Sequence, residues 1–475
     1  MLSVEPIVQA PPIADLFHAV SRRSSCFFLD SSMNIKRLGN YSYLGCDPYL
    51  TFQAKGKCVQ ITRKGKTQTI LDHPLEQLRK ILAEQPPISA SPFPFCGGAV
   101  GYFAYDSYPW IEPIAQSHPD ELNLPDIFFA FYDGLFVCDH CNDRLYALAT
   151  GYPSPTKTTL TRLKSILHEA SKGSFCKEWP TNLVPVSSNF DFESYCAAVD
   201  RVRQYIAAGD VYQVNLSQRF SCSQEIPPSQ LFSALRCRYP SPFGAYLDFG
   251  DFQVLSNSPE RFFNIAGDRL KTQPIKGTKP RGTSPAQDQA LKKSLIESEK
   301  DRAELLMIVD LERNDVAKVA IPGTIEVPAC FAIETYPTVF HLSATVTGQL
   351  RPGIDFIDCL KALFPGGSVT GAPKIRAMQI INELETVRRG IFTGALGWIG
   401  LNGDADLSIA IRTLTCKHKQ CYFHAGGGVV WDSIPEQEYQ ETMVKAHAWM
   451  EVLGGLVPSY QPPIQKKPSK AGAFF

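Results

Sequence analysis

Two segments in the second half of the chain have the pattern of β-hairpins, and they constrain the fold more than any other feature. Each consists of two apolar, strand-like runs around a short turn. The first has residues 262–265 and 270–275 around Ala266-Gly267-Asp268, and the second has residues 407–416 and 421–425 around residues 417–420. The two strands of a hairpin pair antiparallel. The second half of the chain is therefore expected to contain antiparallel sheet.

Around these hairpins the chain divides into two regions. Residues 1–175 combine strand-like runs with only two clear helix patterns, whereas residues 189–455 alternate helices with strands. The polar, proline-bearing residues 173–188 are interpreted as a linker, and the Pro/Lys-rich residues 456–475 as a disordered tail. In the first region the expected strands are at 26–29, 49–52, 128–131 and 134–137, and the expected helices at 74–84 and 158–170.

The composition is that of a large globular protein without an overall charge. The 475 residues are 44% hydrophobic and 20% charged, enough to bury an extensive core. The 47 basic residues balance 47 acidic ones, which argues against nucleic acid and anionic membranes as partners. The N-terminal sequence has no cationic segment before an apolar core, and no apolar run is long enough to span a bilayer. A cytoplasmic location is expected.

The cysteines give little support for a disulfide framework or a zinc site. There are 14, without a repeated spacing, which is typical of reduced thiols. Only Cys138, His140 and Cys141 have the spacing of a metal knuckle. A structural zinc needs a second pair of ligands, and the nearest candidates, Cys416 and Cys421, have the wrong spacing. The sequence therefore disfavours zinc.

Lys276 is a candidate nucleophile in the turn-rich segment that follows the first hairpin. An amine that loses its proton through burial or to a nearby base can attack an electrophilic carbon, although a lone lysine is more often a solvated surface residue. A three-residue hairpin loop would place Glu260 on the face of Lys276, one diagonal step away, where it could accept the proton. A two-residue loop of Gly267 and Asp268 would place the two on opposite faces unless a β-bulge intervenes.

Arg412 and three glycines form a second candidate site. The second hairpin is predicted to place Arg412 opposite residues 424–426, where the run Gly426, Gly427 and Gly428 begins. Glycines leave backbone amides accessible, and the planar guanidinium binds carboxylates in a bidentate manner. The pattern indicates an anion-binding site. A β-bulge with Arg412 in a structural ion pair is equally consistent with the sequence.

Two predicted helices carry carboxylates suited to a metal ion. The first begins near Ser298 and has Glu304 at the border of its apolar stripe. The second has a capping-box pattern from Ser433 to Glu436 and ends at Gly454. One face of this second helix carries Glu438, Glu441 and Lys445. Carboxylates from two helices suit Mg²⁺ when water and an anionic substrate fill its other positions, although each glutamate alone is more often part of a solvated face.

Motifs along nearly the whole chain resemble those of one known family. They are GDVYQVNLSQ at 209–218, SPERF at 258–262, PIKGTKPRG at 274–282, KDRAELLMIVDLERND at 300–315, HLS at 341–343, FPGGSVTGAPK at 364–374, IRT at 411–413, AGGGVV at 425–430 and DSIPEQEYQET at 432–442. The set is similar to that of the chorismate-utilising enzymes, and most similar to the large subunits of aminodeoxychorismate synthase. Anthranilate, isochorismate and salicylate synthases typically have alanine at the position of Lys276, and Phe392 departs from the tyrosine common in anthranilate synthases.

The resemblance implies a fold and an activity. The fold would be α/β of the α+β type, with two large antiparallel sheets packed face to face and helices outside, as in anthranilate synthase component I. The activity would be the Mg²⁺-dependent amination of chorismate at C4 to 4-amino-4-deoxychorismate, in the p-aminobenzoate and folate pathway. The alternatives are anthranilate synthase component I, another chorismate enzyme, and an inactive homologue that only binds a glutaminase.

The resemblance also implies a role for each matching residue. Lys276 would attack C2 of chorismate with help from Glu260, His341 would assist the departure of the C4 hydroxyl, and ammonia would then displace the lysine. The metal ligands would be Glu304, Glu438 and Glu441. The substrate would be bound by Gln213, Gly277, Thr278, Thr370, Arg412, Gly426, Gly427, Gly428 and Lys445.

Two expectations concern a partner and a second ligand. The sequence has no Gly-x-Cys-x-Gly glutaminase motif and no added length for one, so a separate glutamine amidotransferase subunit is expected to supply ammonia. Ser31, Pro240 and Phe243 lie in segments that resemble the tryptophan-binding elements of anthranilate synthases. Core packing explains these three residues equally well.

Overall fold

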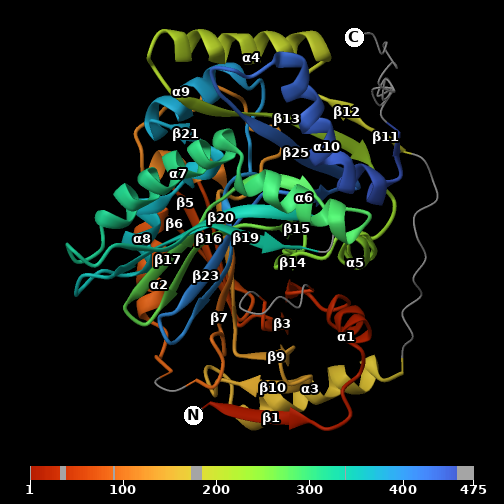
Figure 1. Ribbon diagram of the computed structural model, residues 1–475. Helices are drawn as coiled ribbons and strands as arrows, with labels where there is room; N and C mark the ends of the chain where they lie inside the picture. The colour runs from red at the N-terminus through yellow and green to blue at the C-terminus, as the bar shows by residue number, and fades with distance from the viewer. Residues whose placement is uncertain (1, 33–38, 89–90, 173–183, 337–338, 457–475) are drawn as a thin grey trace, which may run out of the picture.

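Two twelve-stranded sheets, antiparallel throughout, form the centre of the molecule, and helices lie outside them (Figure 1). This confirms the expected fold class. The computed structural model describes residues 2–32, 39–88, 91–172, 184–336 and 339–456. The predicted tail lies outside these residues except for Leu456, and so does most of the predicted linker.

The first sheet takes strands from both ends of the chain. Its strands, in spatial order, are β1 (Ser3–Ile7), β10 (Arg144–Ala149), β9 (Gly134–Asp139), β3 (Tyr41–Gly45), β2 (Phe27–Asp30), β14 (Phe243–Asp248), β15 (Phe252–Ser258), β24 (Thr413–Lys417), β25 (Gln420–Val429), β13 (Gln213–Ser223) and β12 (Ser187–Ser188), with β21 (Gly371–Ala372) also paired to β13. A separate parallel pair consists of β11 (Val184–Pro185) and β26 (Gly455–Leu456).

The second sheet also takes strands from both ends of the chain. Its strands, in spatial order, are β18 (Ile275–Pro280), β20 (Val339–Gln349), β17 (Arg269–Gln273), β16 (Arg261–Ala266), β23 (Ala405–Ile409), β22 (Ala395–Gly400), β7 (Gly98–Phe103), β8 (Ile127–Tyr132), β4 (Leu50–Lys55), β5 (Cys58–Arg63) and β6 (Lys66–Leu71), with β19 (Glu326–Thr335) also paired to β20. Both regions that the sequence distinguishes therefore contribute strands to each sheet.

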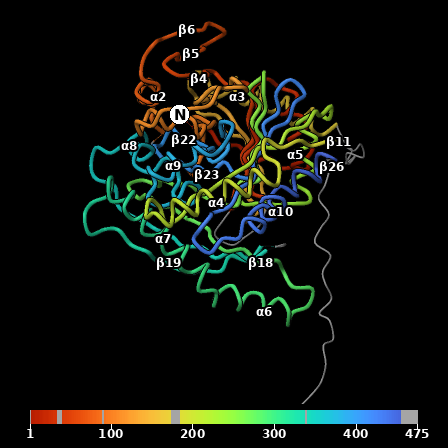
Figure 2. The backbone as a smooth tube through the Cα atoms, turned by 90° about the horizontal axis from the view of Figure 1, so that it is seen from above, coloured from red at the N-terminus to blue at the C-terminus, as the bar shows by residue number. Residues whose placement is uncertain are grey.

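Ten α-helices and two short 3₁₀ helices lie among the described residues. They are α1 (Ile13–Val20), α2 (Pro74–Ala83), η1 (Tyr105–Trp110), α3 (Thr156–Ala170), α4 (Phe192–Ala207), α5 (Pro228–Arg238), α6 (Pro285–Ile296), α7 (Glu299–Ala317), α8 (Phe356–Leu363), η2 (Gly367–Val369), α9 (Lys374–Leu384) and α10 (Pro435–Leu453). Seen from above, α6 and α7 lie on the side of the molecule opposite β5 and β6 (Figure 2).

Apolar side chains on both faces of each sheet explain this layering. Between the sheets, Phe27 and Val254 of the first pack with Tyr102 and Trp398 of the second in one buried cluster. A second cluster joins the outer face of the second sheet to α2, α7 and α8, and a third joins the first sheet to α1, α3, α5 and α10. Burying a large apolar side chain contributes about 1.5–3 kcal/mol. A one-residue slip of a strand would exchange its two faces and disturb this packing, so the apolar side chains specify the register.

Two sequence predictions about local structure are wrong. Residues 407–416 form two strands, because the chain crosses from β23 in the second sheet to β24 in the first around Ile411 and Arg412. The capping box does not form either. Ile434 is the N-cap residue, and Ser433 instead donates to Oε1 of Glu438 over 2.7 Å.

Candidate active site

The first hairpin has a two-residue loop and a β-bulge, and together these place Glu260 on the face of Lys276. Ala266 pairs with Arg269, so the loop is Gly267-Asp268 and not the three residues expected. Between Arg261 and Asn264 the register shifts by one residue. Arg261 pairs with Gln273, which sets Glu260 opposite Pro274 and one diagonal step from Lys276. The bulge thus supplies the alternative geometry that the sequence left open.

Glu260 is a buried carboxyl group next to the backbone of Lys276. Its Oε1 accepts a hydrogen bond from the amide of Ile275 over 3.4 Å. Burial raises the pKa of Glu260 to about 7, against the opposing effects of Ser368 and of the Lys276 ammonium. A carboxyl with such a pKa exchanges a proton at neutral pH, as a general base must.

Lys276 lies half-buried on β18, where its amine faces several charged groups. Burial lowers the pKa of Lys276, and so does Lys445, whereas Glu304, Glu260 and Glu441 act in the opposite direction. Across the described parts of the chain, no side-chain hydrogen bond or ion pair within 4.0 Å holds this amine. A lysine with a lowered pKa and no fixed partner is suited to nucleophilic attack.

His341 lies on β20, the strand that pairs with β18. Lys276 pairs with Leu342 and Thr278 with His341, with a bulge at Gly277, whose φ is +71°. Nδ1 of His341 lies 2.9 Å from Oγ1 of Thr278. Burial, with Arg412 nearby, lowers the pKa of His341 to about 3, so the imidazole is neutral. It can therefore share a hydrogen bond, but it carries no positive charge at neutral pH.

Arg412 lies at the crossing between the two sheets with an unusual backbone conformation. Its φ is +50°, a strained value for a residue other than glycine. Burial lowers the pKa of Arg412, and the nearby Tyr336 acts in the opposite direction. In the described residues the guanidinium has no carboxylate partner within 4.0 Å. A desolvated arginine without an internal anion is suited to bind an external carboxylate.

Tyr336 lies beside His341 and Arg412, and no sequence pattern points to it. The ring contacts that of His341 at 4.9 Å between centroids, and the hydroxyl donates to Oε2 of Glu334 over 2.6 Å. Its relation to Arg412 depends on the crossing between sheets, which local pattern does not reveal.

The glycines of β25 lie between Gln213 and the carboxylates of Glu438 and Glu441. A Cβ atom on Gly428 would lie 2.8 Å from Nε2 of Gln213, and one on Gly427 would lie 3.1 Å from Oε2 of Glu438 and 3.3 Å from Oε1 of Glu441. Gln213 is buried, and neither polar atom of its amide has a partner among the described residues. An unpaired buried amide costs about 1–3 kcal/mol, which a bound ligand can recover.

Lys445 and Glu441 lie on one face of α10, as predicted. Nζ of Lys445 is 2.8 Å from the carbonyl oxygen of Gly426 and 2.7 Å from Oε1 of Glu441. Burial alone would raise the pKa of Glu441, but Lys445, with Lys276 and Lys300, lowers it overall. Burial raises the pKa of Glu304 on α7, and the negative charges of Asp301 and Glu441 add to this rise.

The carboxylates fit a cation in part. Oε2 of Glu438 is buried without a hydrogen-bond partner, and it converges with Oε1 of Glu441 over Gly427. Hard carboxylate oxygens of this kind are ligands for Mg²⁺, which needs few protein ligands because it keeps waters. Among the residues that the structure describes, no group of three or more His, Cys, Asp or Glu side chains is placed to hold a metal ion. The three predicted glutamates, Glu304, Glu438 and Glu441, therefore do not form such a group among the described residues.

The turn before α9 contributes the last predicted residue. Thr370 is buried; its carbonyl oxygen accepts from the amide of Asn215 over 2.8 Å, and its hydroxyl donates to the carbonyl oxygen of Gly366 over 2.9 Å. Ser368, two residues earlier, acts on the pKa of Glu260. The turn thus connects β13, which carries Gln213, to the part of the site that contains Glu260.

A separate cavity of about 280 Å³ lies between the sheets and includes two of the three residues predicted for a tryptophan pocket. Ser31 and Phe243 line it, but Pro240 does not. Arg261 also lines it, stacked 5.0 Å above the Phe243 ring and paired with both oxygens of Asp406 at 2.8 and 3.0 Å. The cavity offers an aromatic wall and charged groups to a small molecule.

Comparison with known proteins identifies the family of this chain. The family of chorismate binding enzymes matches residues 26–451. Aminodeoxychorismate synthase component 1 of Bacillus subtilis (strain 168) is 38% identical over 422 residues, which cover 88% of this chain and 90% of that protein. Anthranilate synthase component 1 of Acetivibrio thermocellus is 35% identical over 453 residues and covers 92% of both.

The fold has a solved relative. Anthranilate synthase component I from Streptococcus pneumoniae TIGR4 has a TM-score of 0.79 and 31% identity, over 88% of this chain and 94% of that one. Every helix in the described ranges is too short or too polar to cross a membrane. With a family match over most of its length and relatives of both kinds at more than 30% identity, the chain belongs to the chorismate-binding enzymes.

Proposed function

We propose that this enzyme aminates chorismate at C4 and forms 4-amino-4-deoxychorismate, as the large subunit of an aminodeoxychorismate synthase. The observation that carries the proposal is the position of Lys276: a half-buried amine with a lowered pKa, on the same face as the buried Glu260. Such an amine is a nucleophile, and a chorismate enzyme with alanine there would lack it.

Substrate binding follows from the charges around this amine. Chorismate carries two carboxylates. Arg412, which has no anionic partner in the described residues, would bind the enolpyruvyl carboxylate. Mg²⁺ held by Glu438 and Glu441, with Glu304 nearby, would neutralise the ring carboxylate. Lys445 and the amides at Gly426–Gly428 add positive potential beside it.

The reaction then has two displacement steps. Lys276 passes a proton to Glu260, whose pKa of about 7 suits the transfer, and its free amine attacks C2. The C2–N bond forms, the ring double bond shifts, and the C4–O bond breaks. The hydroxyl takes up the proton that the attacking amine loses and leaves as water. His341, neutral at this pH, donates a hydrogen bond to the departing oxygen. Ammonia then attacks C4, and the ring double bond shifts back as the C2–N bond breaks. A proton passes from the ammonia nitrogen to the nitrogen of Lys276, which is released as the amine.

Ammonia would come from a separate glutamine amidotransferase subunit, and the reaction would serve the p-aminobenzoate and folate pathway in the cytoplasm. The support is that no glutaminase motif lies in this chain. The purified chain alone should use ammonium salts and not glutamine. The cavity lined by Ser31 and Phe243 is proposed to take tryptophan, or another amino acid with an aromatic side chain.

Mass spectrometry of the product tests the proposal. The chain is incubated with chorismate, Mg²⁺ and ammonia, and a product that retains the enolpyruvyl group is expected. Lys276→Ala should bind chorismate but form no aminodeoxychorismate. Undiminished product from this variant would remove Lys276 from the mechanism.

The second candidate is anthranilate synthase component I. It is favoured by relatives of that name that cover 92% and 90% of the chain, at 35% and 36% identity. This reaction would release pyruvate and yield anthranilate, and the same measurement distinguishes it.

A further inference from the structure

A buried ion pair lies behind the glycine strand of the candidate site. Arg389 donates to both carboxylate oxygens of Glu385, with Nε 2.9 Å from Oε2 and Nη2 2.7 Å from Oε1. Both side chains are buried in the segment that follows α9. A buried pair repays its desolvation only when its other hydrogen bonds are satisfied. The partners of these hydrogen bonds therefore show what the pair does.

Arg389 connects strand β13 to the turn before α9. Its Nη2 donates to the carbonyl oxygen of Asn215 over 2.7 Å, and its Nη1 donates to that of Val369 over 3.0 Å. Val369 immediately precedes Thr370, which itself accepts from the Asn215 amide. One guanidinium thus fixes the spacing between two backbone segments that the site uses. A lysine ammonium lacks this planar arrangement of donors and cannot make all these hydrogen bonds together.

Glu385 holds the same strand two residues further on. Its Oε1 accepts from both the amide and the hydroxyl of Ser217, each at 2.8 Å. In the β13–β25 ladder, Ser217 lies opposite Gly426, and Asn215 lies opposite Gly428. The ion pair therefore binds the two β13 residues that face the outer glycines of the site.

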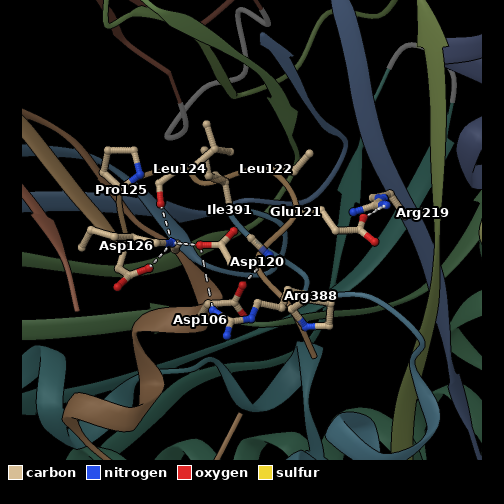
Figure 3. Close-up of a pocket in the computed structure, with 14 residues that line it drawn as sticks. Asp106, Asp120, Glu121, Leu122, Leu124, Pro125, Asp126, Arg219, Arg388 and Ile391 are labelled. Carbon is tan, nitrogen blue, oxygen red and sulfur yellow. Dashed lines mark hydrogen bonds and ion pairs between the residues drawn. The ribbon is translucent and has the colours of Figure 1, made fainter. Parts of the chain in front are cut away.

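The N-terminal region also holds the segment that carries Arg389. The amide of Gly390, whose φ is +59°, donates to Oδ2 of Asp106 over 2.9 Å. Figure 3 shows Arg388 beside Asp106 and Asp120, and Nε of Arg388 donates to the carbonyl oxygen of His118 over 2.6 Å. Asp106 lies in η1, far from the site in sequence.

We propose that the Glu385–Arg389 pair, with Asp106 behind it, is a positioning unit for chorismate binding: it sets β13 and the Val369–Thr370 turn at the spacing that Gln213, Thr370 and the three glycines need. None of the three contacts substrate. The inference rests on the proposed function only in taking these residues as the chorismate site.

Arg389→Lys tests the central contact. Lysine keeps the charge beside Glu385 but cannot bridge the carboxylate and both carbonyl oxygens, so the strand and turn move apart. We expect the Kd of chorismate by calorimetry, and its KM, to rise between about tenfold and about a hundredfold, as small misplacements do, while kcat falls less. Arg162→Lys is the matched control, because Arg162 pairs with the buried Asp133 at 2.6 Å away from the site. It should lower Tm without changing the Kd.

Asp106 provides a second variant in case Arg389→Lys folds poorly. Asp106→Ala should raise the Kd, and Asp106→Asn should restore it, because asparagine still accepts from the Gly390 amide. A lowered Tm with unchanged Kd and KM in both Arg389→Lys and Asp106→Ala would reduce the unit to a structural role and overturn the proposal. Chorismate binding is measured directly. A wild-type chain that binds chorismate but makes no aminodeoxychorismate would therefore refute the proposed function without contradicting this inference.

Discussion

The carboxylate of Glu438 lies directly over Gly427, so close that a Cβ atom there would be 3.1 Å from its Oε2. This contact would be tighter than an ordinary one. Because the neighbours are the mobile ends of Glu438 and Glu441, a methyl group would displace the carboxylates and leave the backbone in place.

Gly427→Ala is therefore expected to weaken Mg²⁺ binding by about tenfold with little change in Tm, as other perturbations around metal ligands do. The activity of the variant should be measured over a range of Mg²⁺ concentrations. Gly426→Ala is the contrast: its Cβ would be 2.4 Å from the carbonyl oxygen of Leu216, so the strand itself would have to move. An unaltered Mg²⁺ profile for Gly427→Ala would argue against metal binding at this place.

Glu441→Ala should remove most of the Mg²⁺-dependent activity. The loss of one of two converging carboxylates is expected to lower activity by about 10–100-fold, without recovery at high Mg²⁺. Glu436→Ala, at an exposed position in the first turn of the same helix, should behave like the wild type. Wild-type activity that persists in a strong chelator would exclude the metal site.

Glu260→Gln should separate binding from chemistry. Glutamine can still accept from the Ile275 amide but cannot take a proton, so kcat should fall by about 10²–10⁴ while the Kd of chorismate stays within a few-fold. In the wild type, a rate that needs the ionised carboxylate should rise as pH increases through the Glu260 pKa of about 7. This rise should be missing from the variant. The same pH profile in both proteins would assign the titration to another group.

Glu312 offers a prediction about stability. This residue of α7 is buried with the Thr272 hydroxyl as its partner, and burial raises its pKa to about 8, from 4.5. The folded state then keeps a proton that the unfolded state has released. The resulting stability is complete below pH 4.5 and is lost as the pH rises through about 8, by up to a few kcal/mol.

Glu312→Gln removes this titration. In urea unfolding at pH 5.5 and 8.5, the wild type should lose more stability at the higher pH than the variant does. Equal losses would show that Glu312 is ionised in the folded protein.

Local pattern predicted much of the secondary structure but not its connections. Residues 128–131 and 74–84 match β8 and α2 closely, because each has its own apolar periodicity. The run at 407–416 looks like one strand for the same reason. Only packing against both sheets tells where it bends, and that information lies in residues distant in sequence.

The candidate site was predicted through motifs rather than geometry. Lys276 and Glu260 stand out in the sequence, but the bulge that brings their faces together depends on pairing of β16 with both β17 and β23. Arg389 and Tyr336 were missed. The sequence does not distinguish a buried arginine from a solvated one. The role of the arginine becomes clear only when the partners of its hydrogen bonds are known.

The mixing of early and late strands in each sheet also governs how the chain can fold. β2 cannot pair with β14 until β14 is synthesised. In the same way β7 cannot pair with β22, which is synthesised almost three hundred residues later. During synthesis the first region therefore presents unpaired apolar edges that only the second half of the chain can cover. Truncation before β22 should leave an aggregating fragment and not a smaller enzyme, so neither region can be exchanged between relatives as a module.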